Sequence, residues 1–218
     1  MSQPPNARHN NASNVTAKPR GRPKRAPADA ETRQRLLRTG LIFLTQKGYS
    51  AVGLDEILRE ASVPKGGFYH YFQSKADFGS ALIDTYHAYF ADKLDRCFAL
   101  EDLSPLSRLH AFVADARKGM ERHDFRRGCL VGNLGQEMGA LPPEYRAKLI
   151  HALEDWQMRT ASCLAAAQVA GEIATHHDPA KLAAIFWIGW EGAVLRAKLE
   201  QSPDPLILFA DGFFAMLN

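Results

Sequence analysis

The sequence predicts an all-α protein of about nine helices, and three observations support this fold class. Apolar residues recur at helical spacing, as Leu37, Leu41 and Leu44 do in the first predicted helix. N-cap residues stand ahead of several apolar segments, and no stretch shows the alternation expected of a strand. With 46% hydrophobic and 23% charged residues, the 218-residue chain is typical of soluble globular proteins and can bury a core.

The first part of the chain contains four predicted helices, at 30–47, at 53–61, over about two turns ending at Phe72, and from 74 to about 100. The first keeps its leucines on one face and ends at Gly48. Gly53 is a tolerable N-cap for the second, and a break of about three residues precedes the third. Ser74, with Asp77 three residues later, forms a capping box that opens the fourth.

Five further helices are predicted at 104–123, at about 128–140, at 142–170, at 179–201 and after Pro205. Ser104 and Pro105 are an N-cap and first-turn pair, and Asp178 and Pro179 repeat that pair. The segment "PAKLAAIFWIGWEGAVLRAKLE" is apolar on most faces through its middle. A helix of this kind needs covering on more than one side.

Cysteine usage and the termini indicate the compartment. Cys97, Cys129 and Cys163 are widely spaced and odd in number, which predicts no disulfide framework, no zinc site and a reducing environment. The N-terminus lacks an apolar signal region, and no apolar run approaches the roughly 18 residues of a membrane span. We therefore expect a cytoplasmic protein with no membrane partner.

Enzyme motifs are absent from the sequence. It contains no HExxH, P-loop, GxSxG or Rossmann glycine pattern. His176 and His177, beside Asp178, suggest a metal site only weakly, because a loop ahead of a helix N-cap is usually solvated. We expect no catalytic residue, no metal and no cofactor.

Residues 63–75, "VPKGGFYHYFQSK", complete a helix, a short turn and a second short helix. That unit is a helix-turn-helix, whose second helix enters the major groove of DNA. Phe68 and Phe72, and partly Tyr71, share the inward face. The candidate DNA contacts are the outward and flanking residues Lys65, Gly66, Gly67, Tyr69, His70, Tyr71 and Lys75. The two glycines allow a DNA backbone to come close, and a phosphate at the next helix N-terminus would accept from Lys75.

The stretch "GLDEILREASVPKGGFYHYFQSKADF" resembles the DNA-binding signature of the TetR family of transcriptional regulators. The matching positions are Ile57, Ala61, Val63, Lys65, Gly66, Tyr69, Phe72 and Lys75. The sequence departs from the signature at Gly53, Leu58, Ser62 and Pro64, where the family usually has a threonine, a small residue, a turn glycine and a serine. The resemblance implies a homodimer on a palindromic double-stranded operator, with a small-molecule effector bound by the C-terminal helices.

The chain is therefore predicted to contain a disordered basic arm (1–28), a helix-turn-helix domain (29–77) and a ligand-binding and dimerisation domain (78–218). The arm carries six basic residues and no acidic one. Its "KPRGRPKR" resembles an AT-hook that would place Arg20 and Arg22 in a narrow A·T-rich minor groove. The alternative is an unspecific polycationic tail that adds affinity by counterion release.

Cys129, in "RRGCLVGNLGQE", is predicted in the first turn of a helix just after Arg126 and Arg127. Both features lower a thiol pKa and favour the thiolate, although a cysteine is often only a small buried hydrophobe. "RGCLVGN" and "FWIGWEGAVLRAKL" resemble the branch of the TetR family that senses reactive electrophiles. This resemblance implies that Cys129 is the sensor and that the effector is a small unsaturated carboxylate or another reactive electrophile.

The remaining predicted ligand contacts come from neighbouring helices. Asn133 lies one turn after Cys129 and is expected to donate to a carboxylate. Trp156, Trp187 and Trp190 either line the pocket or belong to the core.

The favoured function is a repressor that the effector releases from DNA, with the signal passing along the fourth helix. The alternatives are a TetR-type activator and an architectural minor-groove protein that binds through its arm.

Overall fold

The computed structural model describes residues 27–217, and over these residues the chain forms nine α-helices and no strand. The all-α prediction is confirmed. The helices are α1 (Pro27–Lys47), α2 (Leu54–Glu60), α3 (Lys65–Tyr69), α4 (Lys75–Phe98), α5 (Pro105–Glu121), α6 (Leu130–Gln136), α7 (Tyr145–Val169), α8 (Pro179–Glu200) and α9 (Asp204–Ala215). None of these helices combines the length and the apolarity that crossing a membrane requires.

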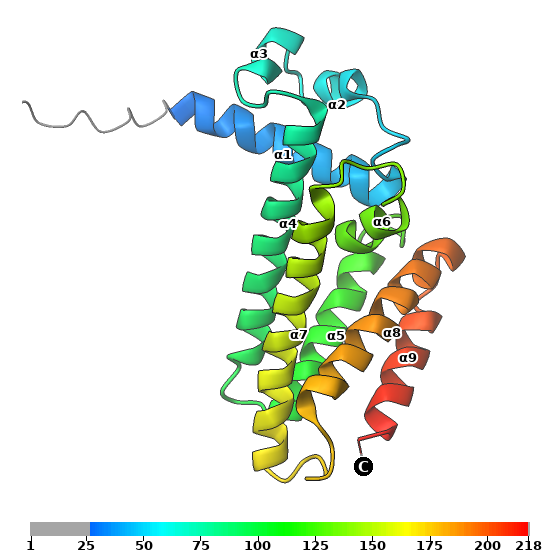
Figure 1. Cartoon of the computed structure of the whole chain (residues 1–218). Helices are drawn as coiled ribbons and strands as arrows, with labels where there is room; N and C mark the ends of the chain where they lie inside the picture. The colour runs from blue at the N-terminus through cyan, green and yellow to red at the C-terminus, as the bar shows by residue number, and fades with distance from the viewer. Residues whose placement is uncertain (1–26, 218) are drawn as a thin grey trace, which may run out of the picture.

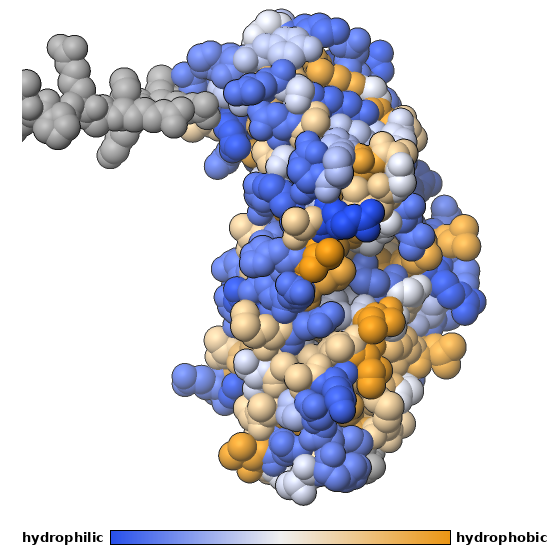
Figure 2. Space-filling view, viewed as in Figure 1, coloured by the Kyte–Doolittle hydropathy of each residue, from blue (hydrophilic) through white to orange (hydrophobic). Residues whose placement is uncertain are grey.

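Two parts of the molecule are visible in Figure 1. Helices α1, α2 and α3 form a small unit at one end, and we call this unit the reader. Helices α4, α5, α7, α8 and α9 form an elongated body, and α4 runs from the reader down the length of that body. The short α6 lies where the end of α1 meets the body. Most of the face seen in Figure 2 is hydrophilic at the reader end, and more hydrophobic residues appear over the body.

Several predicted boundaries need correction. Helix α1 begins at Pro27, inside the 1–28 segment that was expected to lack structure, whereas Arg20, Arg22 and the rest of the arm lie outside the described residues. Helix α3 ends at Tyr69 rather than at Phe72, since the chain turns there. Helix α6 ends at Gln136 rather than near residue 140, because residues 137–140 form a turn.

The predicted N-caps Ser74 and Ser104 are confirmed, with two changes of detail. Ser74 Oγ accepts from the Asp77 amide at 3.0 Å, but the Asp77 carboxylate accepts from Gln73 N (2.9 Å) and not from the cap residue. The start of α5 is capped by Glu172, whose carboxylate accepts from Leu106 N at 2.9 Å. The side chain of Ser104, the N-cap of α5, accepts from no backbone amide of that helix. A carboxylate at a helix N-terminus also favours the helix dipole.

The core of the body is aromatic. Trp156, Trp187, Phe112 and Phe186 are fully buried, and the Trp156 and Trp187 ring centroids lie 5.1 Å apart. Trp187 Nε1 donates to Thr160 Oγ1 at 3.0 Å, so its one polar atom is satisfied inside the core. Packing of this kind makes the body a rigid frame against which the reader and any ligand site are placed.

Candidate functional site

Helix α3 presents one face to the core and the other to solvent. Phe68 and Phe72 are buried, and their ring centroids lie 5.5 and 4.8 Å from that of Phe78 on α4. Tyr69 and His70 are exposed, with 53% of the Tyr69 surface open to solvent. The phenylalanines therefore hold this five-residue helix in place, and the tyrosine and histidine remain accessible to another molecule.

The start of α3 is also open. Lys65 is exposed, and its Nζ lies 3.2 Å from Asp55 Oδ1. A Cβ added at Gly66 would meet no atom within 4 Å, whereas one at Gly67 would lie 3.2 Å from Val63 Cγ1. No part of the described protein thus fills the space in front of Gly66, as close approach of a DNA backbone would require.

The end of α3 contacts the start of α1. The Tyr71 hydroxyl donates to Asp29 Oδ1 at 3.3 Å, and His70 Nε2 lies 3.9 Å from Asp29 Oδ2. Asp29 directly follows the basic arm in sequence. The arm therefore leaves the described structure close to the predicted DNA-binding face.

Lys75 is already engaged inside the protein. Its Nζ donates to Tyr49 O at 3.0 Å and to Val52 O at 2.6 Å, and lies 4.3 Å from the centre of the Tyr49 ring. Burial lowers the Lys75 pKa, against an opposing effect of Glu137. In this arrangement the ammonium is directed to the loop between α1 and α2, not to a phosphate as predicted. The side chain ties α4 to that loop.

A carboxylate from the body holds the same loop on its other side. Glu137 accepts from the amides of Tyr49 (2.8 Å) and Ser50 (2.7 Å). Burial alone would raise the Glu137 pKa, but these hydrogen bonds and Lys75 hold it below its usual value. Gly48 has φ +85°, and a Cβ there would lie 2.1 Å from Glu137 Oε1. The loop can take this path only with glycine at that position.

The C-terminal end of α1 is tied to α6 and α8. Thr45 O accepts from Gly128 N at 3.0 Å, from Asn133 Nδ2 at 3.0 Å and from Lys198 Nζ at 3.1 Å. Asn133 Nδ2 also donates to Leu44 O at 3.0 Å. The prediction that Asn133 donates to a ligand is therefore wrong, because its amide group is bonded to the carbonyls that end α1.

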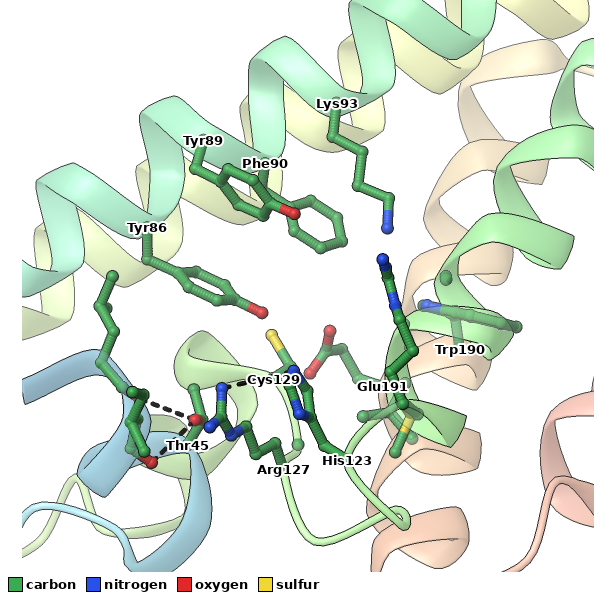
Figure 3. A pocket seen from close by; sticks show the side chains of 18 of the residues that line it. Thr45, Tyr86, Tyr89, Phe90, Lys93, His123, Arg127, Cys129, Trp190 and Glu191 are labelled. Atoms are coloured by element: carbon green, nitrogen blue, oxygen red, sulfur yellow. Dashed lines mark hydrogen bonds between the residues drawn. The ribbon is translucent and has the colours of Figure 1, made fainter. Parts of the chain in front are cut away.

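A cavity of about 460 Å³ lies between the end of α1, the middle of α4, α5, the segment before α6, and α8. Its lining combines aromatic and apolar side chains with several cations, one carboxylate and one thiol (Figure 3). The residues are Arg38, Leu41, Ile42, Thr45, Tyr86, Tyr89, Phe90, Lys93, Ala116, Gly119, Met120, Arg122, His123, Arg127, Gly128, Cys129, Trp190, Glu191 and Val194. Its volume is within the range of small-molecule sites.

Cys129 is the N-cap of α6 and is only 7% exposed. Its sulfur faces the Tyr86 hydroxyl, with the Glu191 carboxylate close by (Figure 3). Burial, together with the charge of Glu191, raises the Cys129 pKa well above its ordinary value. The predicted lowering of this pKa is therefore wrong, since desolvation and a neighbouring carboxylate outweigh the helix N-terminus and the two arginines. The resting thiol carries its proton.

Glu191 reaches into the cavity wall where a glycine leaves room. A Cβ at Gly132 would lie 2.2 Å from Glu191 Oε2, so a larger residue there would force this carboxylate to move. Oε2 is buried and has no hydrogen-bond partner among the described residues. Burial raises the Glu191 pKa from its ordinary value of 4.5 to about 7.

Arginine, lysine and histidine side chains also line the cavity. Arg127 Nε is buried without a hydrogen-bond partner in the described structure, and its Nη1 lies 3.4 Å from His123 Nε2. Lys93 is neutralised by Asp115, whose Oδ2 lies 2.7 Å from its Nζ. Arg127 is therefore better placed than Lys93 to bind an anionic ligand group.

Comparison with known proteins assigns both parts of the chain to one family. Residues 36–82 match the family described as bacterial regulatory proteins, tetR family, and residues 105–213 match the tetracyclin repressor-like C-terminal domain. The chain is 60% identical over 200 residues to the transcriptional regulator AcuR of Cereibacter sphaeroides, an alignment that covers 91% of each chain. The chain belongs to the TetR family.

Two further relatives agree with this assignment. The chain is 32% identical over 187 residues to the HTH-type transcriptional repressor NemR of Escherichia coli K12, covering 81% of this chain and 88% of NemR. It superimposes with a TM-score of 0.83 on the crystal structure of a regulatory protein TetR from Rhodobacter sphaeroides, at 60% identity, covering 84% of this chain and 97% of that one. The protein is a TetR-family transcriptional regulator with an N-terminal DNA-binding unit, as the sequence predicts.

TetR-family regulators are dimeric, and one surface of this chain has the apolar character that a dimer interface needs. Ile188 and Leu199 on α8 are 74% and 80% exposed, and Leu208 on α9 is 71% exposed. Ile185, Leu195 and Ile207 on the same two helices are also exposed. This pattern fits the expectation that the last two helices form the contact between two TetR-family subunits.

The predicted tryptophan contacts divide between cavity and core. Trp190 lines the cavity of this TetR-family protein, whereas Trp156 and Trp187 are not among its lining residues and belong to the core. Sequence reasoning missed Tyr86 and Glu191. A signal for Glu191 was available, because it is the one charged residue between Lys181 and Arg196 in an otherwise uncharged stretch of α8. Over the described residues, no cluster of histidine, cysteine and carboxylate side chains suits a metal ion.

Proposed function

We propose that this TetR-family regulator is a homodimeric repressor, released from a palindromic operator by a small unsaturated carboxylate or reactive electrophile. The cavity carries this proposal, because one pocket joins a thiol (Cys129), an arginine nitrogen without a partner in the described structure (Arg127) and apolar walls. The arginine suits a carboxylate, the aromatic rings suit a short unsaturated chain, and the thiol suits an electrophilic carbon. DNA contacts are proposed at Lys65, Gly66, Gly67, Tyr69, His70 and Tyr71, with Arg20 and Arg22 on the arm.

The hydrogen bonds around α1 supply a route from the cavity to the reader. Gly128 and Asn133 flank Cys129 in sequence, and both bind the carbonyl oxygen of Thr45 at the end of α1. A ligand that moves the segment around Cys129 therefore shifts the end of α1, in addition to the predicted route along α4. Release from DNA then follows if the ligand binds more tightly to the conformer whose α3 helices no longer fit successive major grooves.

The test is fluorescence anisotropy of the full chain on DNA taken from just upstream of its own gene. A scrambled duplex of equal length serves as the control at physiological salt. Acrylate and propionate are then added as a matched pair that differ in the double bond alone. We expect tight binding to the upstream DNA, release by acrylate, and a weaker effect of propionate.

Other outcomes would each change the proposal. Equal, salt-sensitive binding to both duplexes would support a protein that binds through its arm and would contradict the specific repressor. Release by acrylate and propionate at equal concentrations would exclude the double bond as the recognised feature. Stronger DNA binding in the presence of acrylate would indicate an effector-dependent activator.

A further inference from the structure

The resting state of Cys129 raises a chemical problem for an electrophile sensor. A thiol reacts as its thiolate, yet burial and the adjacent carboxylate keep this one protonated near neutral pH. Reaction therefore needs a group that removes the proton when the electrophile arrives. That group must lie next to the sulfur and face the cavity.

We infer that Glu191 accepts the Cys129 proton and so activates the sulfur for addition to an α,β-unsaturated carbonyl compound in the cavity. This inference rests on the proposed function and assigns the chemistry of its sensor. The geometry supports it, because the Glu191 carboxylate lies beside the Cys129 sulfur (Figure 3) and has a buried oxygen with no partner in the described structure. Gly132 leaves the space that this carboxylate occupies.

The proposed step is a balanced addition of S–H across a carbon–carbon double bond. The Sγ proton passes to a Glu191 carboxylate oxygen, and the sulfur forms a bond to the β-carbon of the electrophile. The π electron pair moves toward the carbonyl and gives an enolate. Glu191 then returns the proton to the α-carbon, so the carboxylate is regenerated and no oxidant or reductant is consumed.

The other titratable groups at the cavity are less suited to this role. Burial raises the pKa of Tyr86, so its hydroxyl is not ionised near neutral pH. Burial and the nearby arginines lower the pKa of His123, so its imidazole is a weaker base than usual, and its Nε2 lies 3.4 Å from Arg127 Nη1. A carboxyl group with a pKa of about 7, by contrast, is ionised in part of the molecules and can both accept and return a proton.

Several other ionisable groups line the same cavity as this pair. Tyr86, Tyr89 and Lys93 come from α4, Arg38 from α1, and Arg122, His123 and Arg127 from the end of α5 and the segment before α6. Among them, His123 carries the one imidazole and needs its own control. The variant H123Q is expected to leave the pH profile of the reaction unchanged.

The experiment measures adduct formation at Cys129 of the full chain by intact-protein and peptide mass spectrometry. Methyl vinyl ketone is the probe, because its reactivity does not change with its own ionisation. Rates are compared between wild type and Glu191→Gln from about pH 5.5 to about pH 9. We expect the wild-type rate to rise to a plateau above about pH 7. The variant should be at least about tenfold slower at pH 7 and should keep rising with pH, because only free thiolate then reacts.

The direction in which Glu191→Gln changes the reaction rate distinguishes proton transfer by Glu191 from a purely electrostatic effect. The negative charge of Glu191 raises the Cys129 pKa, so removing it makes the thiolate easier to form. If Glu191 acted through its charge alone, Glu191→Gln would react faster at pH 7, and that result would overturn the inference. An unchanged profile would overturn it as well.

Two glycine variants provide a test that keeps the carboxylate. Gly132→Ala forces Glu191 away from its place, whereas Gly135→Ala, also on α6, would meet no atom within 4 Å. We expect slow adduct formation in the first and a wild-type rate in the second. Circular dichroism and operator binding of the ligand-free proteins show whether each variant is folded.

The adduct and operator-binding measurements distinguish failure of this inference from failure of the proposed function. Release of DNA by acrylate without any adduct at Cys129 would overturn the inference and leave the repressor intact. Adduct formation that depends on Glu191 but leaves operator binding unchanged would instead contradict the proposed release mechanism. Cys97 and Cys163 serve as internal references, since neither lines the cavity.

Discussion

The outward face of α3 and the wall of the cavity both present polar side chains to another molecule, but at different cost. On α3, Tyr69 and His70 are exposed, so water satisfies their polar atoms until DNA replaces it. In the cavity, Glu191 Oε2 and Arg127 Nε are buried and lack protein partners. A buried polar atom without a partner destabilises the fold. The exposed polar atoms of the α3 face therefore do not lower the free energy of unfolding, whereas the buried polar atoms of the cavity do.

Replacing Glu191 gives the largest expected effect. Its folded-state pKa of about 7 lies above its ordinary value of 4.5, so folding favours the protonated acid. The cost of ionising it is absent below about pH 4.5, grows as the pH rises, and is complete above about pH 7. At about 1.4 kcal/mol for each pH unit, this cost approaches about 3 kcal/mol. Glu191→Gln should therefore be more stable than wild type at pH 8.5 by up to about 3 kcal/mol, and equally stable at pH 4.5.

Urea unfolding at the two pH values, at equal protein concentration, measures this difference. A stability change of the same size at both pH values would contradict the assigned titration. It would also remove the distinction between the cavity and the α3 face, because burial of the ionised Glu191 would then not lower the free energy of unfolding.

Two tyrosines of similar exposed fraction test the same distinction through operator binding and effector response. Tyr69 on α3 is 53% exposed and Tyr89 at the cavity is 57% exposed. Tyr69→Ala should weaken operator binding by roughly 10- to 100-fold, about 1–3 kcal/mol, and should leave the effector concentration needed for release almost unchanged. Tyr89→Ala should raise that concentration and leave operator affinity as it is. Anisotropy titrations measure both quantities, and a loss of operator affinity in both variants would contradict the division of roles.

The loop between α1 and α2 links the two regions, and a glycine substitution there tests the link. Gly48→Ala places a side chain at φ +85° and 2.1 Å from Glu137 Oε1, which should cost at least about 1–2 kcal/mol. Gly53→Ala is the matched control, because its φ is −78° and its Cβ would meet nothing within 4 Å. Thermal unfolding should separate the two variants. Equal melting temperatures would mean that Glu137 does not hold the loop.

Ser62 gives the smallest expected effect, and it concerns the reader alone. It adopts φ 52° in the turn between α2 and α3, where the family usually has glycine. The left-handed conformation costs a non-glycine residue roughly 1–2 kcal/mol, and glycine at this position removes that cost. Part of the gain is lost because glycine has greater conformational freedom in the unfolded chain. Ser62→Gly should therefore stabilise the protein by up to about 1 kcal/mol. A lower melting temperature would show that the serine side chain stabilises the turn by a contact of its own.

Much of the reader could be predicted from sequence because its signals are local. The helix boundaries near Gly48 and Ser74, the inward Phe68 and the turn at Ser62 all depend on residues close together in the chain. The arm could not be assessed in the same way, since Arg20 and Arg22 lie outside the described residues.

The cavity could be predicted only in part because it is assembled from distant segments. Cys129 and Trp190 were identified, but no local pattern indicates that Tyr86 on α4 and Glu191 on α8 lie beside the same sulfur. Asn133 was misjudged for the same reason. Its spacing from Cys129 is correct, yet the acceptors of its amide lie on α1, 88 and 89 positions away.

The carbonyl oxygen of Thr45 also has a consequence for protein synthesis. Two of its three donors, Asn133 and Lys198, lie 88 and 153 residues further along the chain. At about 5–20 residues per second, a ribosome needs on the order of ten to thirty seconds after Thr45 to reach Lys198. Until Gly128 and Asn133 are made, Thr45 O has none of these three donors, and the set is complete only when Lys198 has been added. A truncated or nascent chain therefore lacks the contacts that fix the end of α1, so the DNA-binding unit takes its final form only after the helices that line the cavity have been made.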